Sequence, residues 1–124
     1  MYDHGFAYSL VCLTKENIES VQKRAEKIES PEDFTGSEYG MILLDSICMK
    51  LVAIGESIKN LDKATNKELL CLFPQINWRQ AMGMRDIIVH HYFDVDAEEI
   101  FKTLQEDIPI LAKTIEEIKE YLIK

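Results

Sequence analysis

The fold of this chain is decided by residues 41–61, MILLDSICMKLVAIGESIKNL. Large apolar residues recur there at steps of 3, 4, 3, 4 and 3, at Leu44, Ile47, Leu51, Ile54, Ile58 and Leu61. This spacing puts them along one face of an α-helix, in which about 3.6 residues complete a turn. It predicts a central helix over about residues 41–61. The apolar face of that helix could form core, dimer surface or partly both.

Helical spacing also precedes this stretch. The apolar residues Ile18, Val21, Ala25 and Ile28 recur at steps of three and four, which predicts a first helix around them. Residues 30–40, SPEDFTGSEYG, then gather one proline and two glycines into a connection that ends this helix.

Two helix-start signals follow the central stretch. Thr65 with Glu68 three residues later predicts a capping box for a short helix that Pro74 ends. Asn77 with Gln80 predicts a second cap, for a helix that begins at Trp78. The buried side of this second helix would be formed by Ala81, Met84 and Ile88.

A third signal begins the last helix. Asp96 is the expected cap and Glu99 its return partner, and Pro109 should kink the helix without ending it. One apolar face continues past the proline through Ile100, Leu104, Ile108, Leu111, Ile115, Ile118 and Leu122. No segment shows sustained strand alternation. The sequence therefore predicts an all-α, antiparallel four- to five-helix bundle that forms one domain over residues 1–124.

Composition narrows the class of protein. The net charge of −8 opposes nonspecific attachment to a polyanion, although it allows a local basic cleft or a basic partner. Cys12, Cys48 and Cys71 are widely separated and lack CxxC spacing, which favours small core residues over disulfides or a zinc site. No apolar run is long enough to span a membrane, and the start of the chain does not resemble a secretion signal. We expect a cytoplasmic protein without a membrane segment.

Chemically active side chains gather in residues 85–96, RDIIVHHYFDVD. Arginine can hold a phosphate, and histidine can move a proton near neutral pH, so the pair suits metal-independent cleavage of a phosphodiester. On a regular helix Arg85 and His90 lie roughly 140° apart. Two arrangements could still bring the two side chains together. The helix could end near His90, so that its ring turns back toward Arg85, or a second subunit could place its own copy of the segment opposite the first. Asp86, four residues before His90, could orient its ring.

Several ordered segments resemble one known family. Arg85, His90 and Tyr92 fit the pattern RxxxxHxY, which is similar to the signature of the HepT-like branch of HEPN-domain ribonuclease toxins. The segments LVAIGESIKNL, FPQINWRQAMGMRD and HHYFDVDAEEIF (residues 51–61, 73–86 and 90–101) also resemble that family. Asn77 replaces the family's proline, Ser57 its usual alanine, and His91 occupies a variable motif position.

This resemblance implies a function. It implies a dimeric helical bundle in which the two motifs form a cleft for RNA, with Arg85 and His90 as catalytic residues. No metal or cofactor is expected, because these two groups suit metal-independent cleavage. The resemblance also implies a minimal nucleotidyltransferase antitoxin as partner, which adds AMP to Tyr92 and so places negative charge in the cleft. The motif spacing selects His90 over His91, which would line the cleft or the surface.

Other interpretations stand beside these. Arg85 could bridge carboxylates on a solvated helix, and His90 could be a helix C-terminal cation. Glu56 could be a solvent-exposed helix residue, or it could face the cleft and hold Arg85 or His90, because Gly55 lets another backbone approach. A turn and a helix cap explain Asp94 and Asp96 better than a metal pair does. The alternative functions are a noncatalytic HEPN subunit that binds nucleotides or scaffolds a nucleotidyltransferase, and a plain helical interaction protein.

Overall fold

All the regular structure is helical in the computed structural model, which describes residues 2–90 and 96–124 and, at positions 87, 89 and 90, the backbone alone. The elements in chain order are α1 (His4–Arg24), α2 (Glu32–Thr35), α3 (Glu38–Ala64), the 3-10 turn η1 (Leu70–Leu72), α4 (Trp78–His90), α5 (Ala97–Lys102), the π-helical turn η3 (Thr103–Asp107) and α6 (Ile108–Ile123). The prediction of an all-α fold is confirmed over these residues.

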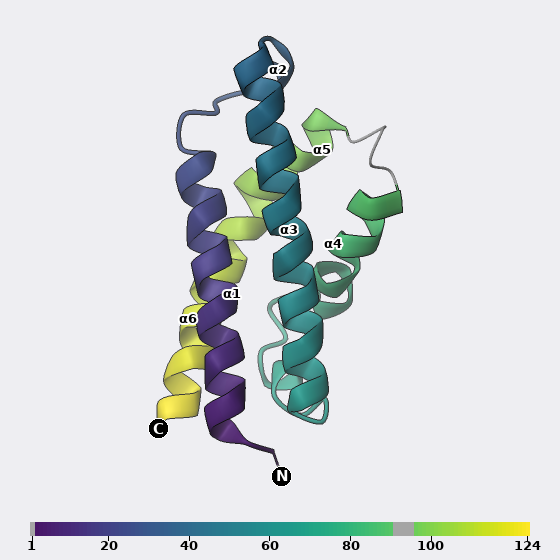
Figure 1. Ribbon diagram of the computed structural model, residues 1–124. Coiled ribbons are helices and arrows are strands. Elements are labelled where there is room, and N and C mark those ends of the chain that lie inside the picture. Colours follow the sequence, from purple (N-terminus) through teal and green to yellow (C-terminus); the bar gives the residue numbers. More distant parts are fainter. Residues whose placement is uncertain (1, 91–95) are drawn as a thin grey trace.

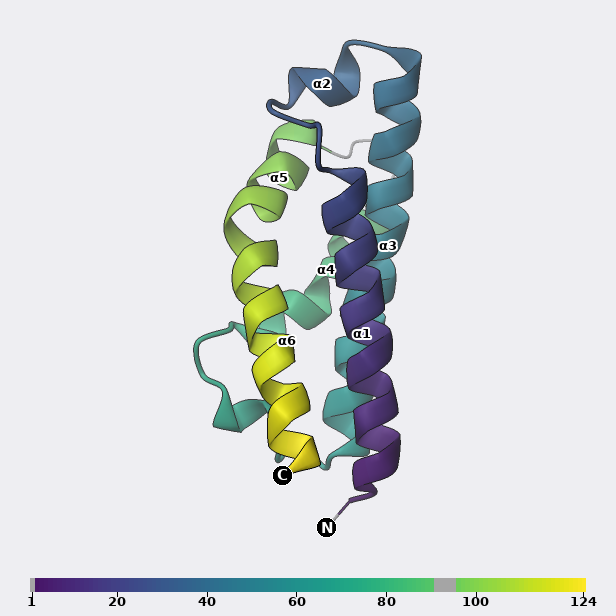
Figure 2. The ribbon, with the colours of Figure 1, turned by 90° about the vertical axis from the view of Figure 1, so that its left-hand side faces the viewer.

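The long helices run alternately up and down (Figure 1). Helix α3 packs against α1 on one side and α4 on the other, and α1 also packs against α6. The short α2 closes the end of the bundle opposite to both termini (Figures 1 and 2). The predicted antiparallel bundle is therefore confirmed.

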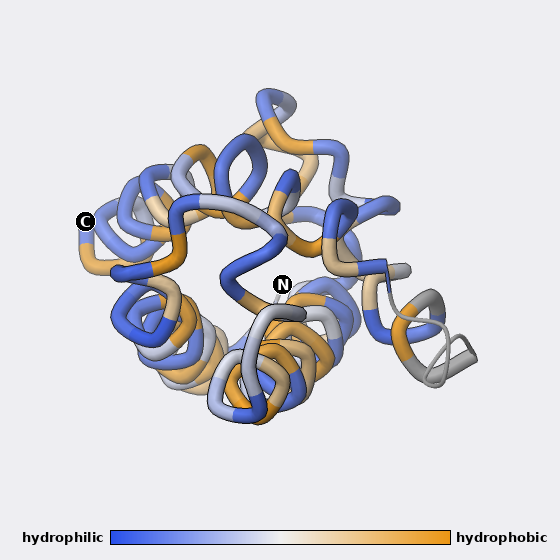
Figure 3. The backbone as a smooth tube through the Cα atoms, turned by 90° about the horizontal axis from the view of Figure 1, so that it is seen from above, coloured by the Kyte–Doolittle hydropathy of each residue, from blue (hydrophilic) through white to orange (hydrophobic). Residues whose placement is uncertain are grey.

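The predicted central helix is α3, and it is longer than its apolar spacing indicated. Ser37 caps its start, because the Ser37 hydroxyl accepts a hydrogen bond of 3.0 Å from Gly40 N. The predicted apolar face is buried throughout, from 4% exposure at Leu44 to 0% at Leu61. This face of α3 is therefore part of the core of the single chain and is not a dimer surface. Figure 3 shows how apolar and polar residues alternate around the turns of the helices.

The first helix begins earlier and ends sooner than predicted. Asp3 caps it, accepting a hydrogen bond of 3.0 Å from Phe6 N, and it ends at Arg24, so Ile28 is buried from the following turn. The predicted connection contains the single helical turn α2. A side chain at Gly40 would collide with its backbone, since a Cβ there would lie 2.2 Å from Asp33 O. Glycine allows α2 to close on the start of α3.

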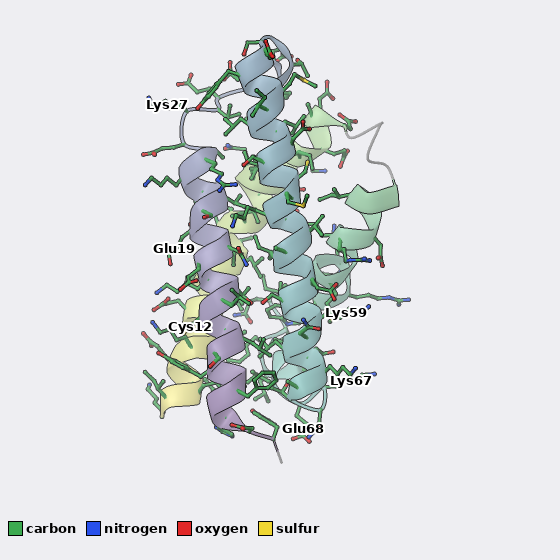
Figure 4. The ribbon with its side chains drawn as sticks, in the orientation of Figure 1. Cys12, Glu19, Lys27, Lys59, Lys67 and Glu68 are labelled. Atoms are coloured by element: carbon green, nitrogen blue, oxygen red, sulfur yellow. The ribbon has the colours of Figure 1, made fainter. Side chains whose placement is uncertain are left out.

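The predicted capping box at Thr65 is wrong. Its hydroxyl donates a hydrogen bond of 2.9 Å to Leu61 O of α3, instead of accepting one at the start of a new helix, and Thr65 is the C-terminal cap of α3. Asn66 and Lys67 follow in the left-handed region, with φ of 57° and 62°, so the chain turns sharply there. Figure 4 shows Lys67 and Glu68 at this lower end of the bundle. Only the 3-10 turn η1 forms where a short α-helix was predicted.

The other two caps are confirmed. Asn77 Oδ1 accepts a hydrogen bond of 3.1 Å from Gln80 N, and Asp96 Oδ1 accepts one of 2.8 Å from Glu98 N. Pro109 does not end the last helix, as predicted: the π-helical η3 precedes the proline, and α6 continues beyond it. Proline lacks an N–H and its ring crowds the preceding turn, so an irregular turn is expected at this place.

The cysteines differ in their surroundings. Cys48 is buried in the core, Cys12 is half-buried and Cys71 is exposed, and all three are free. The prediction that all three are core residues is therefore wrong for Cys71, which belongs to η1 and not to the expected short helix.

Candidate functional site

The start of α4 is fixed by two side chains. Besides the Asn77 cap, the indole Nε1 of Trp78 donates a hydrogen bond of 2.9 Å to Phe73 O, and the Trp78 side chain packs against the core. These contacts hold the connection that precedes α4. They place α4 against α3 from its first turn.

Helix α4 comes very close to α3 at Gly55. A Cβ at this position would lie 3.2 Å from Ala81 O and 3.3 Å from Arg85 N, so the backbones themselves are in contact. The expectation that Gly55 lets another backbone approach is confirmed. Because Gly55 precedes Glu56, the crossing sets Glu56 beside Arg85.

Arg85 contacts two carboxylates at this crossing. Its Nε lies 3.4 Å from Glu56 Oε2, and its Nη1 lies 3.0 Å from Asp86 Oδ1. Of the two interpretations of Glu56, the one in which it holds Arg85 agrees with this contact. Its partial exposure agrees with the other, so Glu56 is both an exposed residue and a partner of Arg85.

The three charged side chains stay open to solvent. Exposure of the side chain is 45% for Arg85, 48% for Glu56 and 60% for Asp86. Exposed ion pairs contribute little to stability, about 0–1 kcal/mol. A guanidinium that is held weakly at the surface remains available to an anion from outside.

The other motif residues, His90 and Tyr92, follow Arg85 at the end of α4 and beyond it. Helix α4 carries a helical backbone from Arg85 to His90. The side chain of His90, and His91 and Tyr92 altogether, lie outside the described residues. The predicted partnership of Arg85 with His90, and that of Asp86 with His90, therefore stay predictions.

Sequence reasoning missed the contact between Arg85 and Asp86. Adjacent residues on a helix do not normally face each other, so helical spacing gives no signal for this pair. The long arginine side chain nevertheless reaches back to its neighbour's carboxylate. Asp86 helps to place the guanidinium.

Among the side chains that the structure describes, which do not include that of His90, no three or more histidine, cysteine or acidic groups gather so that they could hold a metal ion. Over residues 2–90 and 96–124, no helix combines the length and the apolar character needed to cross a membrane.

Comparison with known proteins identifies the family. Residues 14–118 match the model of a family described as ribonuclease HepT-like. The chain belongs to this family. The matched range includes Gly55, Glu56 and Arg85, so the crossing of α3 and α4 lies within the family's domain.

Curated relatives of this HepT-like chain also carry ribonuclease names. A Thermococcus cleftensis protein named "Probable ribonuclease HepT" is 35% identical, with 77% of this chain and 89% of that protein covered. A longer Methanocaldococcus jannaschii protein, named as a gamma-glutamylcyclotransferase with a provisional RNase assignment, is 32% identical over 88% of this chain and 46% of its own length. A Caldanaerobacter subterraneus protein with a provisional RNase name is 34% identical over 62% of this chain and 65% of its own length. No solved structure shows a significant match.

Proposed function

We propose that this chain is a metal-independent endoribonuclease, the toxin of a pair whose antitoxin is a minimal nucleotidyltransferase. The observation that carries the proposal is the exposed Arg85 guanidinium, held by Glu56 where α3 and α4 cross. Arg85 precedes His90 and Tyr92 at the spacing of the family motif. The family match and the RNase names of relatives support RNA as substrate. We place the protein in the cytoplasm, as expected from its sequence.

The proposed chemistry needs one cation and one proton carrier. Arg85 would bind the scissile phosphate and stabilise the charge that grows on its oxygens. His90 would accept the proton of the ribose 2′-hydroxyl as that oxygen attacks phosphorus, or give a proton to the departing 5′-oxygen. A homodimer with two motifs in one cleft would supply both histidines at once.

Glu56 and Asp86 act on Arg85 in this proposal. They hold the guanidinium at the α3–α4 crossing while RNA is absent, at 3.4 Å and 3.0 Å. An RNA phosphate would take over the N–H groups, because a phosphate accepts two parallel hydrogen bonds from arginine. The two carboxylates thus position Arg85 and do not touch the reacting atoms.

A noncatalytic HEPN subunit, which binds nucleotides or scaffolds a nucleotidyltransferase, is the second candidate. The two carboxylates beside Arg85 favour it, because they compete with an RNA phosphate for the guanidinium. The net charge of −8 favours it as well. The two candidates differ in whether RNA is cut.

Cleavage by the purified protein, freed of any partner, separates them. We expect it to cut RNA with a chelator present, and Arg85→Ala or His90→Ala to abolish cutting while circular dichroism keeps its helical signal. Arg79→Ala is the matched control, since Arg79 is an exposed arginine of the same helix outside the motif. If both motif variants cut RNA like the unchanged protein, the catalytic assignment is wrong.

A separate experiment tests whether the nucleotidyltransferase inhibits this chain by modifying Tyr92. Incubation with the nucleotidyltransferase and ATP should add nucleotide mass at Tyr92, because the added phosphate would repel the RNA backbone from the cleft. Tyr92→Phe should gain no mass, whereas Tyr39→Phe, which changes a tyrosine that is 74% exposed on α3, should still be modified. Mass gained by Tyr92→Phe would place the modification on another residue.

A further inference from the structure

A second candidate site is lined by residues other than Arg85, Glu56 and Asp86. A cavity of about 360 Å³ opens between α4 and the arm formed by α5, η3 and α6, which runs the length of the molecule in Figure 2. Its inner wall is apolar and buried, and consists of Leu51, Ile88, Ile100, Ile108 and Leu111. Cavities that bind small molecules measure roughly 300–1,000 Å³ and have such walls.

The mouth of the cavity is polar and rich in acceptors. Glu99, Thr103 and Asp107 follow each other at steps of four on the arm, so they share one face of it. Gln75, Asn77 and Gln80 approach from the other side. Of these amides, Gln75 already donates to Glu117 and Asn77 already caps α4.

The charges at the mouth select the class of ligand. Among the residues that the structure describes, two carboxylates line the cavity and no lysine, arginine or histidine does. An anionic group such as a phosphate would be repelled there, whereas a cation with N–H donors would meet two acceptors of opposite charge. The cavity is therefore unsuited to RNA or nucleotides.

The helical arm is irregular at the same place. Thr103 and Asp107 are the first and last residues of η3, so the turn that precedes Pro109 contributes both of them to the lining of the cavity. Glu56, Arg85 and Asp86 do not line the cavity, so it is separate from the cluster at the α3–α4 crossing. Both sites nevertheless include residues of α4.

We propose that this cavity binds a small organic cation with an apolar body, of the kind represented by a primary alkylamine. The apolar body would lie against Ile100, Ile108 and Leu111, and the ammonium group would donate hydrogen bonds to Glu99 and Asp107 at the mouth. Binding joins α4 to the arm, and a ligand that binds only the folded chain stabilises it.

Three probes of one size test the ligand class: hexylamine, hexanol and hexanoate. The readout is the methyl NMR signals of Ile100, Ile108 and Leu111 during titration of the full chain. Hexylamine should shift these signals in a saturable way, hexanol more weakly, and hexanoate not at all. The proposal fails if hexylamine leaves the lining methyl signals unchanged, or if hexanoate shifts them as strongly.

Substitutions at the mouth test the role of charge. Glu99→Gln with Asp107→Asn should weaken hexylamine binding by about tenfold or more, because both charge-assisted hydrogen bonds are lost. The matched control, Glu98→Gln with Glu106→Gln, removes the same charge from exposed neighbours that do not line the cavity. It should leave the affinity unchanged. Equal weakening by both pairs would mean a general charge effect and would overturn the proposed contact.

Discussion

At the scale of single residues, two hydroxyls stand out because they are buried in an apolar core. Thr14 of α1 and Ser57 of α3 are 0% and 4% exposed, and their hydroxyls are hydrogen-bonded to each other. Thr14 Oγ1 also donates to Leu10 O at 2.8 Å. With its proton used in this way, Thr14 is the acceptor for Ser57, whose other partner, Leu10 O, is 3.5 Å away. The Ser57 hydroxyl therefore needs Thr14 as its hydrogen-bond partner, whereas the Thr14 hydroxyl keeps Leu10 O as a partner without Ser57.

Replacing Thr14 should therefore lower the free energy of unfolding more than replacing Ser57 does. Thr14→Val keeps the shape of the side chain but leaves the Ser57 hydroxyl poorly paired, which costs about 1–3 kcal/mol of unfolding free energy. Ser57→Ala should cost less than about 1 kcal/mol, because Thr14 still donates to Leu10 O. The double variant should lose less than the sum of the two. Urea unfolding of all four proteins measures this, and a larger loss for Ser57→Ala than for Thr14→Val would contradict it.

Cys48 makes stability depend on pH at the alkaline end. Burial, with a smaller contribution from the charge of Asp45, raises the pKa of the Cys48 thiol from 9.0 to about 11. Between these values the folded chain holds a proton that the unfolded chain has lost, so the free energy of unfolding falls as pH rises. Cys48→Ala should remove this part of the decline. Urea unfolding at a series of pH values would show converging curves for the two proteins, and parallel curves would contradict the assignment.

At the scale of elements, periodic spacing predicted the helices more reliably than the cap signals did. The face from Leu44 to Leu61 is fully used as core, because burial is a sum over many residues on one side of a helix. Thr65 failed as a cap because a threonine hydroxyl can also donate back into the preceding helix, as it does to Leu61 O. Local sequence cannot decide between these two uses of the same hydroxyl.

The sequence predicted only part of the candidate site, because the rest depends on contacts between different helices. The motif selected Arg85, and glycine at position 55 indicated a close approach, but spacing within one helix does not set the register between two. That register places Glu56 Oε2 at 3.4 Å from Arg85 Nε. Packing along the whole length of α3 and α4 determines it.

The α3–α4 crossing should tolerate a methyl group poorly. In Gly55→Ala the new Cβ would lie 3.2 Å and 3.3 Å from backbone atoms of Ala81 and Arg85, so α4 must shift. Crowding of this kind costs about 1–3 kcal/mol, which outweighs the gain in helix propensity of up to about 1 kcal/mol. Gly83→Ala on α4 is the control: its Cβ would meet nothing within 4 Å, and it should stabilise by about 0.5–1 kcal/mol. Unfolding in urea measures both, and a stabilised Gly55→Ala would show that the helices are not in close contact.

At the scale of the whole molecule, two exposed apolar residues of α3 lie on a face of the helix that leads toward the candidate site. Ile42 and Met49 are 59% and 69% exposed, and they precede Glu56 at steps of seven, so the three lie on nearly the same face of the helix. Since the buried face of α3 is already filled, a dimer that uses α3 would have to use this exposed one. Such a dimer would bring Arg85 of two chains toward a shared cleft, as the proposed chemistry requires.

The exposed face of α3 therefore makes a prediction about assembly. Sedimentation should show a dimer, and Ile42→Asp with Met49→Asp should give a monomer, because buried like charges oppose association. RNA cleavage should fall with the dimer, while circular dichroism keeps its helical signal, since both residues are exposed in the single chain. Phe6→Asp with Leu72→Asp changes two apolar residues of similar exposure, 55% and 52%, on α1 and η1, and should leave the dimer intact. If the α3 pair still sediments as a dimer, association uses another surface, and the two Arg85 sites need a different route to a common cleft.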